Sequence, residues 1–412
     1  MRLTAVTFGT EGDGRPIAAL CCALKDAGHD VTLLAAEGTL SSADELNVPH
    51  ATLAGDIRGA LQPGIAAVVS GKMSLNATAK ALARIANDNV AAWMHGTLGV
   101  AAGCDALICA GLAAFAGFSV AEKLAIPVIG AGMFPLTPTA EFPSPFLPPG
   151  KTPRWLNRFS HQLAVQVLWR AFRKATNEAR GAVLGLPPRR KPWTSHAMLY
   201  GISPSLLPKP ADWPSYAYIC GQWVRPAHKW DPPRSLSEFL AAGDDPIYIG
   251  FGSMVGFDRN AVLDSIVAAV NGRRALFHPG WSGTQGLQLP NNFFVIDDTP
   301  HDWLFPRTSL IIHHGGSGTT HSAARSGIPS IVLPFAGDQA FWAERLQILG
   351  VAPDSTSVRH ISAASLAHAM DIAGSTQVRS RAASLGEAMR TEEGGLASAV
   401  KTIELLLRSE AR

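Results

Sequence analysis

Three stretches of the sequence combine glycine with side chains that can hold a phosphate or move a proton. Residues 9–14 read Gly-Thr-Glu-Gly-Asp-Gly, residues 250–253 read Gly-Phe-Gly-Ser, and residues 313–320 read His-His-Gly-Gly-Ser-Gly-Thr-Thr. Glycine lets a backbone approach a phosphate closely, and the N-terminus of a following helix adds free N–H groups and a partial positive charge. Each stretch is therefore a candidate phosphate-binding loop, although any one alone is equally an ordinary tight turn.

The third stretch is the most specific. His314 directly precedes the glycines, and Ser317 and Thr319 add hydroxyl donors to the backbone donors. Fixed donors at a helix N-terminus suit a leaving diphosphate that is stabilised without a metal ion. The alternative, a metal held by the paired histidines, lacks a carboxylate or third histidine at ligand spacing. We therefore expect no metal and no cofactor, with a nucleotide-linked co-substrate instead.

Two carboxylates each have a functional and a structural interpretation. Asp13 either braces its glycine turn or acts as a general base that faces a cleft. Asp338 and Gln339 follow an apolar run, so they are either a polar turn with a helix cap or ligands of sugar hydroxyls. Their position one strand–helix unit after the histidine–glycine loop favours the second interpretation.

Two alternating blocks of strands and helices are predicted to position these residues. The first block has strands at 3–8, 31–35, 106–109 and 127–129 and helices at 16–26 and 118–124, with Pro16 in the first helical turn. The second block has strands at 246–251, 274–277, 293–296, 309–313 and 330–333, with helices at 260–271 and 319–326. Such alternation predicts an α/β fold with two parallel sheets, whose ligands lie in a cleft outside the carboxyl ends of the strands.

The middle of the chain joins the two blocks. A proline-rich loop at 135–153 leads into a long helix at 154–181, and a stretch rich in proline and tryptophan at 204–233 is the predicted linker. The predicted domains are 1–214 and 215–394, and a last helix within 395–412 is expected to pack back on the first domain.

Composition limits the class of protein. The 412 residues fit two domains of about 200 residues each. A net charge of +3 is too close to zero for a nucleic-acid binder, which must neutralise a run of phosphates. The odd number of cysteines, 5, without metal spacing, and the lack of a signal peptide or membrane span in the sequence predict a cytoplasmic protein.

Three separated segments in the second half resemble one protein family. Residues 300–306 (Pro-His-Asp-Trp-Leu-Phe-Pro), 313–320 and 337–339 (Gly-Asp-Gln) resemble family 1 glycosyltransferases, above all the sterol glucosyltransferases and then the glycopeptide and macrolide antibiotic enzymes. The opening loop 9–16 and the segments 120–124, 137–139 and 141–143 are similar to the same group. The resemblance implies a GT-B fold, in which two Rossmann-like domains face an interdomain cleft.

The resemblance also assigns roles to residues. It implies an inverting transfer of a hexose, with glucose from UDP-glucose expected, to a hydroxyl of a small apolar acceptor such as a sterol, polyketide, carotenoid or flavonoid. Asp13 would be the catalytic base. The implied donor-binding residues are Ser253, Trp281, Ile296, His301, His314, Gly316, Ser317, Gly318, Thr319, Asp338 and Gln339.

The acceptor side is specified less closely. Gly12, Phe134, Phe142 and Phe146 are the candidate acceptor-binding residues, because the phenylalanines can form an apolar pocket. Where sterol enzymes follow an Asp with an Asn-Pro pair in the second loop, residues 105–111 read Asp-Ala-Leu-Ile-Cys-Ala-Gly, so no acceptor contact through that Asn is expected. The basic region 151–191 is either a solvated helix face or a peripheral contact with the inner face of a membrane.

Other interpretations stay open. The alternatives within nucleotide-sugar chemistry are a dTDP-sugar-dependent natural-product glycosyltransferase and a nucleotide-sugar epimerase on a similar two-domain fold. An NAD-dependent oxidoreductase also begins with a glycine loop, but the order here is G-x-x-G-x-G, and Asp13 would repel a pyrophosphate. A non-catalytic binding protein would be expected to lack His314 or Asp338, and both are present.

Overall fold

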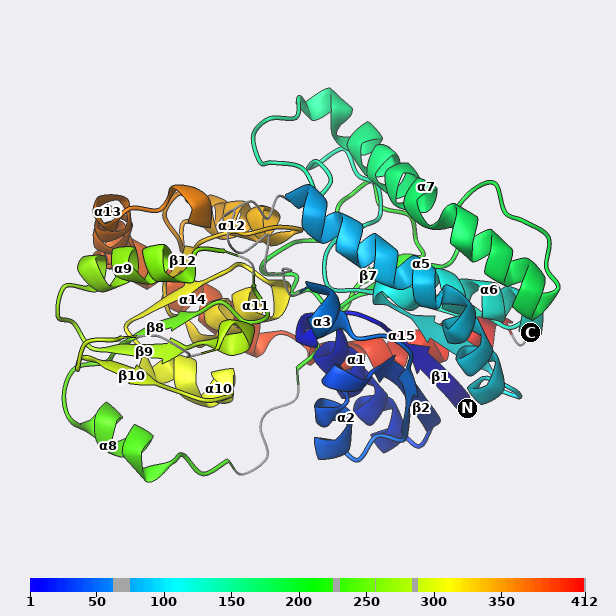
Figure 1. Ribbon diagram of the computed structural model, residues 1–412, viewed down its shortest axis with the longest axis horizontal. Helices are drawn as coiled ribbons and strands as arrows, with labels where there is room; N and C mark the ends of the chain where they lie inside the picture. Colours follow the sequence, from blue (N-terminus) through cyan, green and yellow to red (C-terminus); the bar gives the residue numbers. More distant parts are fainter. Residues whose placement is uncertain (62–74, 225–229, 256, 284–287, 411–412) are drawn as a thin grey trace.

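The computed structural model describes residues 1–61, 75–224, 230–255, 257–283 and 288–410. These residues form two α/β units, each built on a parallel sheet (Figure 1). The first sheet has seven strands in the order β3-β2-β1-β4-β5-β6-β7, and the second has five in the order β10-β9-β8-β11-β12. The predicted α/β class with two parallel sheets is confirmed.

The N-terminal unit is a sheet covered by helices on both faces. Its strands are β1 (Arg2–Val6), β2 (Asp30–Ala36), β3 (His50–Leu53), β4 (Ala106–Cys109), β5 (Val128–Gly132), β6 (Ala197–Tyr200) and β7 (Ala217–Ile219). Its helices are α1 (Glu11–Asp26), α2 (Ser41–Glu45), α3 (Ile57–Leu61), α5 (Leu75–Val100), α6 (Ala114–Leu124) and α7 (Asn157–Leu184). All four residues of β4 are buried, as expected for a central strand that is covered on both faces.

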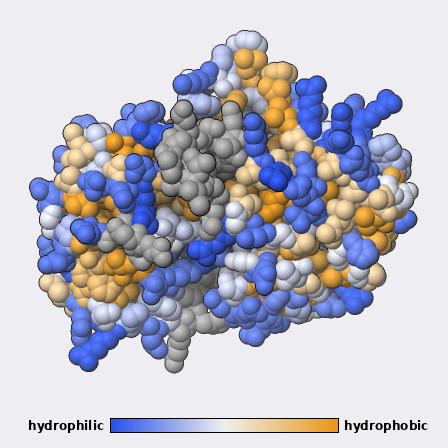
Figure 2. Space-filling view, viewed as in Figure 1, coloured by the Kyte–Doolittle hydropathy of each residue, from blue (hydrophilic) through white to orange (hydrophobic). Residues whose placement is uncertain are grey.

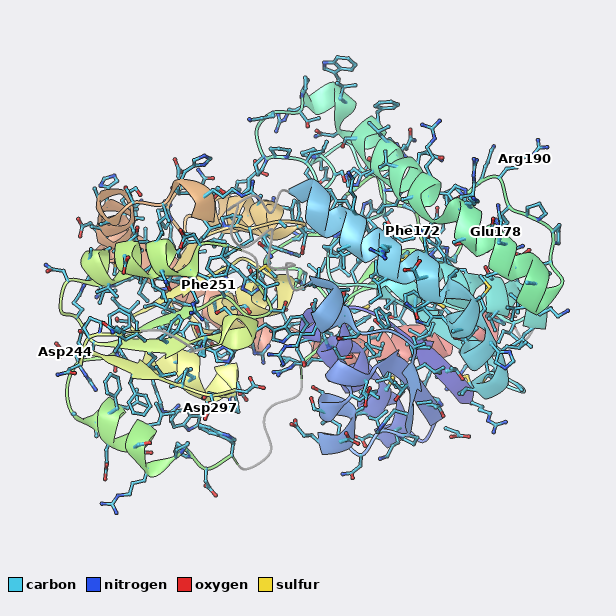
Figure 3. All side chains as sticks on the ribbon, viewed as in Figure 1. Phe172, Glu178, Arg190, Asp244, Phe251 and Asp297 are labelled. Carbon is cyan, nitrogen blue, oxygen red and sulfur yellow. The ribbon has the colours of Figure 1, made fainter. Side chains whose placement is uncertain are left out.

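The C-terminal unit repeats this plan with fewer strands. Its strands are β8 (Ile247–Gly250), β9 (Ala275–His278), β10 (Phe293–Val295), β11 (Leu310–His313) and β12 (Ser330–Val332). Its helices are α8 (Arg234–Ala241), α9 (Arg259–Val270), α10 (His301–Leu304), α11 (Ser317–Ser326), α12 (Gln339–Ile348), α13 (Ala363–Ala373) and α14 (Thr376–Thr391). In Figure 3, Phe251 lies at the inner end of this sheet, whereas Asp244 lies at its outer end.

The last helix, α15 (Gly395–Glu410), leaves the C-terminal unit and lies against α1 (Figure 1). Ala399, Ile403 and Leu407 belong to the same hydrophobic cluster as Leu3 and Ile17 of the N-terminal unit. The helix therefore contributes its apolar side to the core beneath β1.

Helix α1 begins earlier than the sequence predicted. It starts at Glu11, and the Thr10 N–H donates to Asp13 Oδ2 at 2.9 Å, so the glycine-rich segment forms the first turn of the helix. Pro16 consequently lies inside the helix, where it removes the backbone hydrogen bond that would reach the carbonyl of Gly12. The predicted place of Pro16 in the first turn was wrong.

Candidate active site

A large cavity lies between the two units. Its volume is about 2500 Å³, and residues of both units line it. The loops that follow β1, β4 and β5 form one wall, and the loops that follow β8 and β12 form the other. The cavity therefore lies where the carboxyl ends of the two parallel sheets meet, as the topology predicts.

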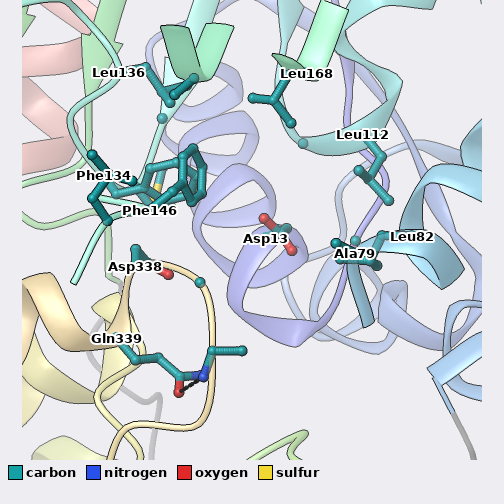
Figure 4. Close-up of a pocket in the computed structure, with 18 of the residues that line it drawn as sticks. Asp13, Ala79, Leu82, Leu112, Phe134, Leu136, Phe146, Leu168, Asp338 and Gln339 are labelled. Atoms are coloured by element: carbon teal, nitrogen blue, oxygen red, sulfur yellow. Dashed lines mark hydrogen bonds between the residues drawn. The ribbon is translucent and has the colours of Figure 1, made fainter. Parts of the chain in front are cut away.

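Asp13 is a carboxylate on the N-terminal wall, which also carries other titratable groups, among them Asp212 and His196 (Figure 4). Its carboxylate accepts a hydrogen bond from the Thr10 backbone, which holds it at the first turn of α1. Burial raises its pKa to about 6, and the two hydrogen bonds from Thr10 oppose this rise only in part. At neutral pH the group is mostly ionised yet basic enough to take a proton, which suits a general base.

Asp338 and Gln339 lie on the opposite wall, and both line the cavity. Asp338 Oδ2 accepts a hydrogen bond from Trp342 Nε1 at 2.8 Å, and burial raises the pKa of Asp338 to about 6. The oxygen of the Gln339 amide accepts from the backbone N–H groups of Phe335 at 2.7 Å and Ala336 at 3.0 Å. The Gln339 oxygen thus braces its own loop. The amide nitrogen donates to Met254 Sδ at 3.2 Å, so one of its two N–H groups is left to contact a ligand.

The histidine–glycine loop enters the N-terminus of α11. His314 is buried, and its Nδ1 has no hydrogen-bond partner among the described residues. Burial lowers the pKa of His314 to about 4, so its imidazole is neutral at physiological pH and can donate one proton. Gly315 has a φ of +90°, and a side chain there would meet the Gln339 carbonyl, so this position requires glycine.

His313 was not among the predicted site residues. It ends β11 and is fully buried, and its Nε2 also has no partner among the described residues. Its Nδ1 accepts from the Gly315 backbone at 3.1 Å. The sequence carried one signal for His313, its position directly beside His314, but that signal does not distinguish the two histidines.

The hydroxyl of Ser317 connects the two units. Ser317 Oγ donates to the Met133 carbonyl after β5 at 2.7 Å. The α11 residues Gly316, Ser317, Gly318 and Thr319 do not line the cavity, although they form the first turn of the helix and its cap. In this arrangement the donors that α11 can offer to an anion are backbone N–H groups.

The residues expected near a nucleoside lie apart from the cavity lining. Ile296 is buried in a cluster with Leu304 and Phe305, and His301 stacks on Phe305 with ring centroids 4.1 Å apart. Trp281 lies under the Arg58 guanidinium, 5.7 Å from the ring centroid. Ser253 does line the cavity, on the wall that also carries Asp338.

An ion pair also connects α1 to the C-terminal unit beside these residues. Arg15 forms a salt bridge with Asp298, which follows Asp297 at the end of β10 (Figure 3). Burial raises the pKa of Asp298, but the Arg15 guanidinium outweighs this and keeps the pKa below its ordinary value.

Aromatic and aliphatic side chains surround Asp13 on the acceptor side. Phe134 and Phe146 line the cavity and meet edge to face with centroids 5.4 Å apart (Figure 4). Phe142 does not line the cavity, because it is buried against Phe341 of α12, 5.3 Å away. Gly12 is exposed and also lies outside the lining.

Several cavity residues were not predicted from the sequence. The apolar ones include Leu82, Leu112, Phe115, Leu168, Phe172 and Trp193. His196 lies among them with its ring 4.5 Å from Phe118, and its Nδ1 has no partner among the described residues. These residues lie on α5, the turn before α6, α6, α7 and the loop after α7, and none of them belongs to a motif identified in the sequence.

Two features are absent from the described part of the chain. None of its helices is long and apolar enough to cross a membrane. Among the same residues, no three His, Cys, Asp or Glu side chains gather as metal ligands do.

Two family models match the chain. Residues 3–143 match the glycosyltransferase family 28 N-terminal domain, and residues 262–403 match the C-terminal domain of erythromycin biosynthesis protein CIII-like proteins. A sterol 3-beta-glucosyltransferase of Arabidopsis thaliana is 33% identical over 97% of this chain and 65% of its own length. A sterol 3-beta-glucosyltransferase of Cryptococcus neoformans is 32% identical over 98% of this chain and 27% of its own length. The chain thus spans between about a quarter and two thirds of these curated relatives.

Solved structures share the whole architecture. The glycotransferase of kitacinnamycin superposes with a TM-score of 0.69 at 19% identity and covers 98% of both chains. The glycosyltransferase VinC in complex with dTDP gives a TM-score of 0.67 at 17% identity over 99% of this chain and 100% of its own. At these identities the superpositions establish a common fold.

Proposed function

The chain belongs to the family 1 glycosyltransferases of the GT-B fold, and from this premise we propose that it transfers a hexose from a nucleotide diphosphate-sugar to a hydroxyl of an apolar acceptor. We take the hexose to be glucose, the donor to be UDP-glucose and the acceptor to be a sterol or a similarly rigid apolar molecule. The choice of sterol and glucose follows the sterol 3-beta-glucosyltransferases that are 30% identical or more over most of this chain.

The C-terminal wall supports the donor site. Neither His314 nor the first turn of α11 lines the cavity, so the diphosphate would bind beside it, held by the neutral imidazole of His314 and the backbone N–H groups at the start of α11. The sugar would then extend into the cavity toward Asp338 and the Gln339 amide nitrogen. These groups bind anionic and hydroxyl oxygens through hydrogen bonds, and no step of the proposal requires a cofactor.

The reaction is a single displacement at the anomeric carbon. An oxygen lone pair of the acceptor hydroxyl attacks this carbon, while the bond between the carbon and the distal phosphate oxygen breaks on the opposite side and configuration inverts. The hydroxyl proton passes to the Asp13 carboxylate, and the electron pair of the broken bond leaves with the nucleoside diphosphate. Donors at the α11 N-terminus stabilise the charge that develops on the leaving phosphate.

The single observation that carries this proposal is the position of Asp13. A carboxylate whose pKa is about 6 lies on an otherwise mainly apolar wall and faces the loop of Asp338 across one cavity. A dinucleotide site would place a pyrophosphate at this loop, where the Asp13 charge repels it.

The test is product analysis with matched donors. The full chain is incubated with a sterol acceptor and either UDP-glucose or a dTDP-sugar, and each donor is also incubated without acceptor. The products are identified by mass spectrometry and NMR. A β-glucoside formed from UDP-glucose is the expected product. Transfer from dTDP-sugars alone would show that the donor is a dTDP-sugar and not UDP-glucose. Conversion of the nucleotide-sugar in the absence of acceptor would indicate an epimerase.

A further inference from the structure

Helix α7 and the short turn before it carry apolar side chains that the fold leaves uncovered. Their exposed fractions are high, and they recur every four residues along one side of the helix: Trp155 80%, Phe159 55%, Leu163 50% and Val167 56%. The opposite side of α7 holds the helix in place, because Phe172 packs into the cluster that contains Ile85 and Ala86 of α5 (Figure 3). The exposed stripe 155–167 is therefore not needed to attach α7 to the protein.

The charge around this stripe has one sign. Residues 151–177 contain no Asp or Glu, and their exposed basic side chains are Lys151, Arg154, Arg158, Arg170, Arg173 and Lys174. Within the described part of the chain, Arg158 of this stripe forms an ion pair with Asp212, 3.9 Å away. A second copy of the chain would bring the same positive charge to this face, whereas an anionic surface would neutralise it.

The stripe leads directly into the cavity. Leu163 and Val167 are exposed and line the cavity at the same time, as do the neighbouring Phe146 and Leu147 of the proline-rich loop. Figure 2 shows hydrophobic residues at the upper rim of the molecule, where α7 begins, with hydrophilic residues beside them. An apolar path thus runs from outside the protein to the wall that carries Asp13.

We propose that the stripe 155–167 and its basic surround dock the N-terminal unit on an anionic bilayer surface, and that the acceptor enters the cavity from the bilayer. An exposed apolar stripe flanked by Lys and Arg is the arrangement by which a helix lies in a membrane interface. The entry of the acceptor rests on the proposed transferase function, whereas the docking does not.

The docking is tested by sedimentation of the full chain with vesicles, without donor or acceptor. The vesicles are made of phosphatidylcholine alone or with phosphatidylserine. We expect binding to the anionic vesicles, release by high salt, and at least a tenfold loss of binding in the double variant Trp155→Glu, Phe159→Glu. The matched control carries Ile348→Glu and Leu405→Glu, which add the same charge at side chains that are 62% and 59% exposed outside the stripe, so it should bind as the wild type does.

Equal binding of the double variant and the wild type, or no binding of the wild type to anionic vesicles, would overturn the docking proposal. A dimer in gel filtration that the double variant abolishes would assign the surface to a second copy instead. Circular dichroism and the thermal midpoint of each variant show whether a loss of binding comes from the changed surface or from unfolding of the protein.

The entry route has its own readout. Transfer to a sterol embedded in anionic vesicles should fall at least tenfold in the double variant, while transfer to the same sterol delivered in cyclodextrin should be unchanged. An equal fall with both deliveries would refute entry from the bilayer. Vesicle binding without transfer from any donor would refute the proposed function and leave the docking intact.

Discussion

Asp13 and Asp338 belong to different units of the protein, yet besides burial, which is the main cause, the negative charge of Asp13 also raises the pKa of Asp338. Both line one cavity, and burial raises the pKa of each to about 6. A ligand with several hydroxyl groups that enters between them can donate hydrogen bonds to both carboxylates. The pair therefore marks the region where donor sugar and acceptor are expected to meet.

Replacement of Asp13 by Asn should remove the base and keep the hydrogen bond from the Thr10 backbone. We expect turnover to fall by about 10²–10⁴-fold, with the dissociation constant for UDP unchanged, because proton transfer contributes on this scale. Steady-state kinetics measure the turnover, and calorimetric titration with UDP measures the dissociation constant. Glu11→Gln is the control, because it removes one charge from the same helix turn. The native Glu11 accepts from Arg15 and lies outside the cavity, so this variant should keep its activity. Full turnover of Asp13→Asn would eliminate Asp13 as the base.

The pH dependence of the reaction should report the raised pKa of Asp13. Below about pH 6 the carboxylate is protonated, so kcat/KM should fall about tenfold for each further pH unit. The residual activity of Asp13→Asn should lack this acidic limb. An acidic limb that persists unchanged in the variant would belong to another group, with Asp338 the first candidate.

The same shift predicts how stability depends on pH. A carboxyl whose folded pKa lies above its unfolded value binds its proton more tightly when folded, so its contribution to stability is lost as pH rises from about 4 to about 6. Asp13→Asn should therefore raise the free energy of unfolding by about 2–3 kcal/mol at pH 8 and by about half of that at pH 5. Urea unfolding of both proteins at both pH values measures this difference. A variant that is destabilised equally at pH 5 and pH 8 would contradict the prediction.

Much of the fold could be predicted because short apolar runs that end in glycine identify parallel strands. This worked for β1, β4, β8, β11 and β12. It failed for β6 and β7, because each is a strand of three or four residues in or beside a stretch that proline and tryptophan made look like a linker. Helix α5 was missed because no motif marks its start.

The site was less predictable, because the place of a side chain depends on packing between units. Nothing near Phe142 in the sequence distinguishes it from Phe146, yet Phe341 of α12 covers the first and leaves the second in the cavity. In the same way, the Gln339 amide was expected to face a sugar, and its oxygen instead binds two backbone N–H groups of its own loop.

Binding of UDP should stabilise the protein through His314. At about 100 times its dissociation constant, UDP should add about 2.7 kcal/mol to the free energy of unfolding, which a thermal shift detects. We expect His314→Ala to abolish this shift and Ser317→Ala to keep most of it, because the Ser317 hydroxyl donates to the Met133 carbonyl. A shift that His313→Ala removes and His314→Ala preserves would transfer the phosphate contact to His313. The comparison with dTDP and NAD in the same assay identifies the nucleotide.

Gln339 should show two separable effects, because its amide oxygen and nitrogen have different partners. Gln339→Leu leaves the Phe335 and Ala336 N–H groups without an acceptor, so the free energy of unfolding should fall by about 1–3 kcal/mol. Gln339→Glu keeps an acceptor for both groups and removes the donor that would contact the sugar. This variant should therefore stay closer to the wild type in stability while its KM for the donor rises by about tenfold or more, since a lost hydrogen bond with an added charge costs at least about 1.4 kcal/mol. Urea unfolding and donor kinetics on both variants test whether the effect on stability and the effect on donor binding separate in this way. An unchanged KM in Gln339→Glu would restrict Gln339 to bracing the loop and leave Asp338 as the sugar ligand on this wall.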